Sequence, residues 1–301
     1  MAMRVATFAS SDRMLAASLR TQARMAELQM QQASGTISSS YGGLGRSTKP
    51  LLDLEASLKT SQAYASAAKE ASGRVEMMYS TMSSIANLLT EFRGQITAMM
   101  SADSGDSSLL TLVSAAEGFR EELASLLNTT FEGRYLFSGD ATQTAPVDLT
   151  GYAADAETAS TAYYQGDHTV TTVKIARDQT VAYGVTADNA AFEQAFRALS
   201  IVADADSIDS ELLQSSYDLI VSSLDATIAV QSRLSVNAST LERSVERQGD
   251  YETYLDAMIS ELKDADVTQI VVTLTSYETQ LQASYSAIAK VQSLNLLDYL
   301  R

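Results

Sequence analysis

The sequence predicts a mainly α-helical protein, an elongated helical bundle with long helices at both ends and a small β-containing insert. Apolar residues recur at alternating spacings of three and four in several long segments, which is typical of coiled-coil seams. Pro50 and Pro146 are the only prolines, so little interrupts these helical patterns. The stretch 131–205 differs, because it is rich in glycine, threonine and tyrosine and contains short β-prone runs.

The first expected region, 1–45, combines an N-terminal assembly helix with a loop. Val5 to about Ala33 reads as an amphipathic helix, and a loop rich in serine and glycine follows it up to Gly45. No charged residue lies between Leu28 and Gly45. Uncharged polar surfaces suit burial against identical neighbours, so we expect self-assembly, with pairing of the two chain ends in one molecule as the alternative.

The second expected region, 46–130, is a helical hairpin of the core bundle. Pro50 suits a first helical turn, and this helix should run to about Ser101. A cap at Asp106 or Ser107 should open a third helix that reaches about Thr129. The two seams consist of Val75, Met78, Met82, Ile85, Leu89, Phe92, Ile96 and Met99, and of Leu109, Leu112, Ala116, Phe119, Leu123 and Leu126.

The region 131–205 should hold a β-hairpin and an outer β-containing insert. We expect strands within Thr169–Ile175 and Thr180–Val185, and a short helix over Ala191–Val202 that returns to the bundle. A long core helix, 206–265, should follow, opened by Ser207 with Asp209 in its first turn.

The last region, 266–301, is the expected C-terminal assembly helix. The seam of the long core helix slips by about one residue near Asp266, which is a stutter, so the helix partner should change there. Between Ala265 and Leu297 the only charged residues are Asp266, Glu278 and Lys290. The predicted assembly interface comprises Phe8, Leu15, Leu19, Ile270, Leu274, Tyr277, Leu281, Ile288, Val291 and Leu297.

Composition and charge disfavour several function classes. The chain has no cysteine and a single histidine, which excludes thiolate metal sites and clusters of imidazole ligands. A net charge of −16 argues against nucleic acid as a partner. No apolar run approaches the roughly 20 residues that span a bilayer, and no cleaved secretory signal is recognisable, so we expect no membrane partner.

An enzymatic site is not expected. The acidic pairs Glu121 with Glu122 and Asp204 with Asp206 suit solvated surfaces in so acidic a chain. His168 lies in a polar stretch without a nucleophile motif and is expected in a surface turn. We therefore predict no catalytic residues, no cofactor and no metal.

One segment is specific enough to indicate a family. Asn128-Thr-Thr-Phe-Glu-Gly-Arg-Tyr-Leu-Phe-Ser-Gly139 resembles a segment of the hook-filament junction proteins of the bacterial flagellin superfamily. In that family a helix ends at the asparagine and a hairpin then lies on the helical core. The hairpin-motif residues are Asn128, Gly133, Arg134, Tyr135, Phe137 and Gly139, and we expect Tyr135 and Phe137 to share one face of a strand.

The resemblance implies a flagellin-like fold with paired N- and C-terminal coiled-coil helices, and a structural role in the bacterial flagellum. A junction protein of this kind joins hook to filament, polymerises with itself in a ring or tube, and contacts a neighbouring hook-associated protein and flagellin. The resemblance also implies export through the flagellar secretion channel with a dedicated chaperone, and hence an extracellular location. The alternatives are a filament-forming flagellin and, less favoured, an intracellular coiled-coil scaffold.

Overall fold

A computed structural model describes residues 2–101, 106–205, 207 and 209–293. These residues form two compact units, one from the described residues of 2–59 and 252–293 and one from the described residues of 60–251. The helices are α1 (Ala2–Ser34), the 3-10 helix η1 (Tyr41–Ser47), α2 (Thr48–Ser101), α3 (Asp106–Leu127), α4 (Ala190–Ala203), α5 (Ser210–Lys263) and α6 (Val267–Ser293). The strands are β1 (Thr130–Phe131), β2 (Arg134–Tyr135), β3 (Thr172–Ala176) and β4 (Gln179–Ala182). The expected mainly α-helical class is confirmed.

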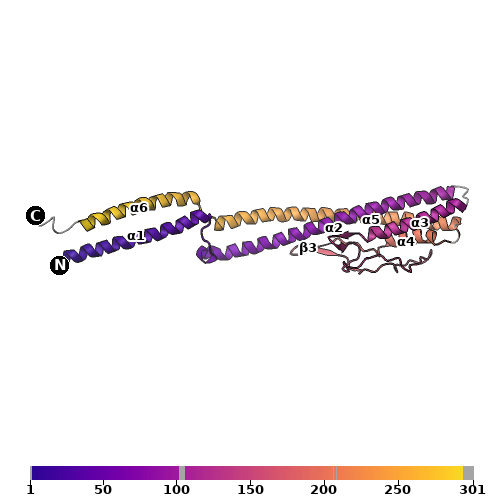
Figure 1. The fold of residues 1–301 in the computed structure, drawn as a ribbon, viewed down its shortest axis with the longest axis horizontal. Helices are drawn as coiled ribbons and strands as arrows, with labels where there is room; N and C mark the ends of the chain where they lie inside the picture. Colours follow the sequence, from indigo (N-terminus) through magenta and orange to yellow (C-terminus); the bar gives the residue numbers. More distant parts are fainter. Residues whose placement is uncertain (1, 102–105, 206, 208, 294–301) are drawn as a thin grey trace. The chain divides into compact units, whose positions relative to one another are not determined.

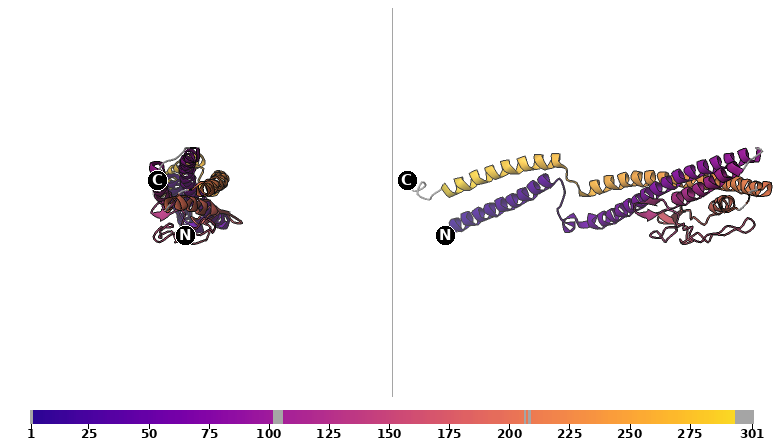
Figure 2. Two further views of the ribbon diagram at one scale, coloured as in Figure 1. Left: turned by 90° about the vertical axis from the view of Figure 1, so that its right-hand side faces the viewer. Right: turned by 45° about the vertical axis from the view of Figure 1, so that its right-hand side comes forward.

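In the first unit, α1 and α6 lie side by side and run antiparallel (Figures 1 and 2). We call these two helices the terminal pair. The break between α5 and α6 falls at residues 264–266, where the stutter near Asp266 predicts it. Asp266 caps the new helix, because its Oδ1 accepts a hydrogen bond from the Gln269 N–H at 2.9 Å.

The second unit contains the main apolar core, and the predicted seam of α2 is confirmed. Its residues from Val75 to Ile96 are at most 2% exposed. The partner rows on α3 and α5 bury Leu112, Ala116, Leu123, Ile220, Leu224, Leu234 and Leu241. Phe92 of α2 meets Phe119 of α3 edge to face, with ring centroids 5.7 Å apart.

The start of α5 differs from the sequence prediction. The helix begins at Ser210, and its capping residue is Asp209 rather than Ser207, because Asp209 Oδ1 accepts from the Leu212 N–H at 2.8 Å. Both residue types can cap a helix, and the carboxylate suits the positive end of the helix dipole best.

The chain between α3 and α4 forms two small antiparallel sheets, β1-β2 and β3-β4. Strands β3 and β4 overlap the two β-prone runs, but β3 ends one residue after its run, at Ala176, and β4 begins one residue before its run, at Gln179. The two strands pair Val173 with Val181, with an irregularity after Lys174. Helix α4 packs on α3, as Figure 1 shows. It is one residue longer at each end than the expected helix over Ala191–Val202. Among the described residues, none of the helices is long and apolar enough to cross a membrane.

Candidate assembly interface

The terminal pair has a thinly packed inner seam. From α6 it buries Ile270, Leu274 and Leu281, each at 7–8% exposure, and half-buries Tyr277 and Ile288. Within residues 12–34 of α1, the facing residues are Ser18, Thr21, Met25 and Leu28, of which Ser18 alone is fully buried. Ser18 and Thr21 are small and Met25 and Leu28 are only half-buried, so the seam buries little apolar area.

The α1 residues chosen from sequence lie elsewhere on the helix. Leu15 is 50% exposed and Leu19 is 56% exposed, so neither belongs to the seam with α6. Within one chain α6 packs on the other face of α1, so the place of Leu15 and Leu19 in an assembly interface stays a prediction. The side chains of Phe8 and Val291, and all of Leu297, lie outside the described residues.

Backbone hydrogen bonds join the two chain segments next to the terminal pair. The Ala265 N–H donates to Gly35 O at 2.9 Å, and the Ile37 N–H donates to Lys263 O at 2.8 Å. Gly35 has φ of 69°, a left-handed conformation that glycine adopts without strain. The end of α1 and the break before α6 are thus fixed to each other.

A carboxylate adds a second connection near this point. Glu55 of α2 accepts a hydrogen bond from Tyr41 Oη at 2.7 Å and lies 3.8 Å from Lys263 Nζ. The hydrogen bond to this carboxylate and its charge raise the pKa of Tyr41. Glu55 therefore links η1, α2 and the last residue of α5.

The hairpin motif forms a tight turn followed by a buried segment. Glu132 and Gly133 both have positive φ, 50° and 74°, as a two-residue hairpin turn between paired Phe131 and Arg134 requires. The Asn128 side chain makes two hydrogen bonds with the backbone of Val147. Its Nδ2 donates to Val147 O and its Oδ1 accepts from the Val147 N–H, both at 3.0 Å. The Arg134 side chain is exposed and makes no hydrogen bond or ion pair with a described residue.

The expectation that Tyr135 and Phe137 share a strand face is wrong. Strand β2 ends at Tyr135, which is half-buried, whereas Phe137 is fully buried against Phe192 of α4 at a centroid distance of 6.1 Å. Gly139 has φ of 66°, and an added Cβ would lie 2.1 Å from Asp167 O. The segment after β2 is therefore enclosed by the rest of the insert instead of lying on a sheet.

A row of polar residues on α5, spaced by whole heptads, donates hydrogen bonds to backbone carbonyls of the insert. Ser216 Oγ donates to Ala198 O at 3.0 Å, and Ser223 Oγ donates to Ala191 O at 2.6 Å. Farther along, Asn237 Nδ2 donates to Ala182 O at 3.1 Å and Ser244 Oγ donates to Ile175 O at 3.3 Å. Members of this row are separated by whole heptads, so one face of α5 satisfies backbone carbonyls of α4 and the β3-β4 sheet.

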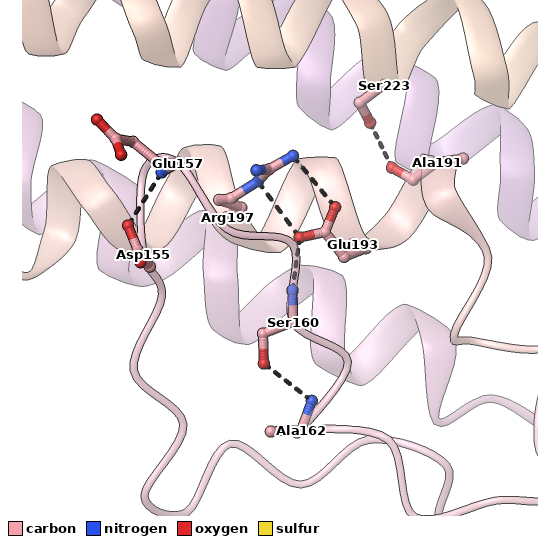
Figure 3. A network of polar contacts seen from close by, with 8 residues as sticks. All are labelled: Asp155, Glu157, Ser160, Ala162, Ala191, Glu193, Arg197 and Ser223. Carbon is pink, nitrogen blue, oxygen red and sulfur yellow. Dashed lines mark hydrogen bonds and ion pairs between the residues drawn. The ribbon is translucent and has the colours of Figure 1, made fainter.

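Figure 3 shows the polar contacts between α4 and the chain segment 155–162, which precedes α4 in the sequence. The buried Glu193 carboxylate accepts from the Ser160 N–H at 3.1 Å and lies 3.3 Å from Arg197 Nε. Beside it, Tyr163 packs on Phe196 with ring centroids 4.4 Å apart, and Tyr152 packs edge to face on Tyr163. Burial, followed by the charge of Glu193, raises the pKa of Tyr152 to about 12.

The polar residues considered for chemistry lie in structural or solvated positions. His168 is exposed and bonded to Asp188, while Glu121 and Glu122 lie on the exposed side of α3. Asp204 pairs with Arg120 Nη1 at 2.9 Å, and Asp206 lies outside the described residues. Within the described part of the chain, no group of three acidic or imidazole side chains is arranged to hold a metal ion.

Comparison with known proteins identifies the family. The bacterial flagellin N-terminal helical region matches residues 5–142, and the bacterial flagellin C-terminal helical region matches residues 218–300. The chain belongs to the bacterial flagellin family. The first match begins within α1 and the second contains all of α6, so both helices of the terminal pair belong to the shared part of the fold. Residues 143–217 of this flagellin-family chain lie outside both matches.

Similar proteins carry one recurring description. The flagellin-family chain is 25% identical over 246 residues to flagellar hook-associated protein 3 of Escherichia coli K12, covering 75% of this chain and 77% of the relative. It is 22% identical over 260 residues to flagellar hook-associated protein 3 of Salmonella typhimurium LT2, covering 77% and 79%.

Two solved structures share the fold. A putative flagellar hook-associated protein from Vibrio parahaemolyticus superposes with a TM-score of 0.62 at 16% identity, covering 75% of this chain and 99% of that one. Flagellar hook-associated protein 3 from Legionella pneumophila gives 0.57 at 14% identity, covering 69% and 98%. At these identities the likeness establishes the flagellin-like fold of the chain.

Proposed function

We propose that this chain is a structural adaptor that joins the flagellar hook to the filament, without catalytic activity. The observation that carries the proposal is the terminal pair, whose inner seam is thin and whose outer surface keeps large apolar residues exposed. Isolated helices are marginal in water, so such a pair gains most of its stability from further packing. The family and the names of the relatives support flagellar assembly as the source of that packing.

The proposed interface has two layers. Ile270, Leu274, Tyr277, Leu281 and Ile288 pair α6 with α1 inside one copy. Contacts between copies would use the outer layer, which consists of Leu15, Leu19, Met30, Val271 and Val272, all more than 40% exposed. Phe8, Val291 and Leu297 remain proposed members of this interface.

The partners follow from the same role. Copies of the chain would assemble in a ring or tube, with a neighbouring hook-associated protein on one side and flagellin on the other. Export through the flagellar channel with a chaperone would bring the chain outside the cell. We further propose that the regions 1–45, 46–130, 131–205, 206–265 and 266–301 act as the successive parts of this assembly.

A deletion strain and isolated flagella test the proposal. Cells that lack the chain should build hooks without attached filaments, and an antibody against the chain should label the hook-filament junction alone. Labelling along the whole filament, with thousands of copies per flagellum, would instead indicate a filament-forming flagellin. Retention of the chain inside the cell would indicate the intracellular scaffold.

A further inference from the structure

Helix α1 has two unlike flanks beside the face that packs on α6. Arg13, Arg20 and Arg24 are separated by seven and four residues, so they lie along one flank. All three are exposed, and none forms a hydrogen bond or ion pair with a described residue. Leu15 and Leu19 lie on the opposite flank and are also exposed.

One contact shows which flanks of α1 and α6 share a side. Gln22 Nε2 donates to Tyr285 Oη, and Gln22 is seven residues from Leu15. On α6, Val271, Glu278 and Tyr285 are spaced by seven residues, or about two helical turns, and therefore lie on one flank. The resulting side, which we call the leucine face, comprises Leu15, Leu19, Gln22, Val271, Glu278 and Tyr285.

The opposite side of the terminal pair, which we call the arginine face, combines the three arginines with uncharged residues of α6. Helical spacing places Gln269, Thr273 and Gln280 on that flank of α6. Asp12, seven residues before Leu19, adds a second acid to the leucine face, whereas Glu27, seven residues after Arg20, lies beside the arginines. The arginine face is therefore basic overall, and the leucine face is apolar with two acids.

Charge makes the two faces complementary. Four arginines against Asp12 and Glu27 give α1 a net charge of +2, although the whole chain carries −16. Of the two acids between Ala265 and Leu297, Asp266 already caps α6, whereas Glu278 is exposed and has no partner among the described residues. Opposite charges favour contact between such surfaces and set their register.

The positions along the pair also agree. The helices are antiparallel, with Ala265 bonded to Gly35 at one end and Tyr285 bonded to Gln22 farther along. Glu278 lies between these two points, and linear interpolation places it level with Ala26 and Glu27, within one helical turn of Arg24. A neighbouring copy placed beside the first would thus bring Arg24, the nearest arginine of its α1, within one helical turn of Glu278.

We infer that the leucine face of one copy packs on the arginine face of the next copy, with Glu278 of one pairing with Arg24, and Arg20 beside it, of the other. The inference rests on the proposed function, since it needs copies side by side. A contact between unlike faces is head-to-tail and generates a ring or a tube. A two-fold contact between arginine faces would bring the unpaired arginines together, which like-charge repulsion opposes.

Charge exchange tests the pairing in cells. Arg24→Glu and Glu278→Lys should each reduce the copies found on isolated flagella by about tenfold or more, as expected when like charges face each other in a contact. The two changes in one chain should restore the wild-type amount. Arg233→Glu, at an exposed arginine of α5, is the matched control and should have no effect.

Cross-linking tests the geometry directly, because the chain has no cysteine. Arg24→Cys with Glu278→Cys places thiols on opposite faces of one pair, so oxidation on flagella should give a ladder of linked copies. Arg233→Cys with Glu278→Cys should stay monomeric. If the chains reach the flagellum but give no ladder, or if charge exchange fails to restore assembly, this inference is wrong and the adaptor role stands. If wild-type chain is not found at the junction, the adaptor role itself fails.

Discussion

The terminal pair and the bundle of α2, α3 and α5 are both built from helices with alternating three- and four-residue spacing, yet they pack differently. In the bundle, the seam residues from Val75 to Ile96 are at most 2% exposed. In the pair, the described part of α1 buries Ser18 alone, and Leu19 stays 56% exposed. The bundle completes its core within one chain, whereas the pair leaves large apolar side chains exposed, which we propose are covered by other molecules in the assembly.

The largest expected contrast comes from burying a charge in each region. Leu89→Asp should unfold the bundle, with a loss of more than about 4 kcal/mol, because an unpaired carboxylate would replace a fully buried side chain. Leu281→Asp should leave the thermal unfolding of the bundle unchanged and abolish motility. Thermal unfolding and a swarming assay on both variants make the comparison. If Leu281→Asp lowers the stability of the bundle, the terminal pair and the bundle fold as one unit and the contrast is wrong.

Two glycines of the hairpin motif offer a graded test inside the bundle unit. Gly139→Ala should cost more than about 3 kcal/mol, since the new Cβ would meet Asp167 O at 2.1 Å in a left-handed backbone. Gly133→Ala should cost about 1 kcal/mol, because its Cβ would meet nothing within 4 Å and the strain of positive φ alone remains. Denaturant unfolding measures both, and equal losses would contradict the enclosed path of residues 136–139.

Sequence reasoning succeeded where a local period decided the structure. The seam of α2 and the break near Asp266 follow from spacing alone, because a helix that keeps one face buried must repeat its apolar residues. The turn at Gly133 was also foreseeable from its glycine. The same reasoning could not place the insert, because the contact of Gly139 with Asp167 and the bonds from α5 to Ala182 and Ile175 depend on distant segments.

The assembly residues show a second limit. Helix α1 has two candidate faces, one with Leu15 and Leu19 and one with Ser18, Met25 and Leu28. The predicted assembly interface took its α1 residues from the first face, whereas α6 packs on the second face within one chain. Periodicity identifies a face that can be buried and does not say which partner buries it.

Alkaline pH should weaken the insert. Because burial raises the pKa of Tyr152 from 10.0 to about 12, the neutral phenol is favoured in the folded state. This contribution to stability is present below pH 10 and is lost as the pH rises from about 10 to 12, where the unfolded chain ionises first. Tyr152→Phe should reduce the loss measured by unfolding across that range, and an unchanged pH profile would show that this phenol does not titrate as a buried group.

The smallest expected effect on stability belongs to the exposed flank of α1. Leu19→Ser should change the unfolding free energy of the isolated chain by less than about 0.5 kcal/mol, because exposed substitutions away from packed contacts are nearly neutral. Assembly on the flagellum should nevertheless fall, since the same leucine is proposed to be buried between copies. The matched control is Ile228→Ser on α5, where a residue of 54% exposure should tolerate the change in both assays. If Leu19→Ser assembles as well as Ile228→Ser, the exposed leucines of α1 are ordinary surface. The contrast between a bundle with a complete core and a terminal pair with exposed apolar residues would then rest on α6 alone.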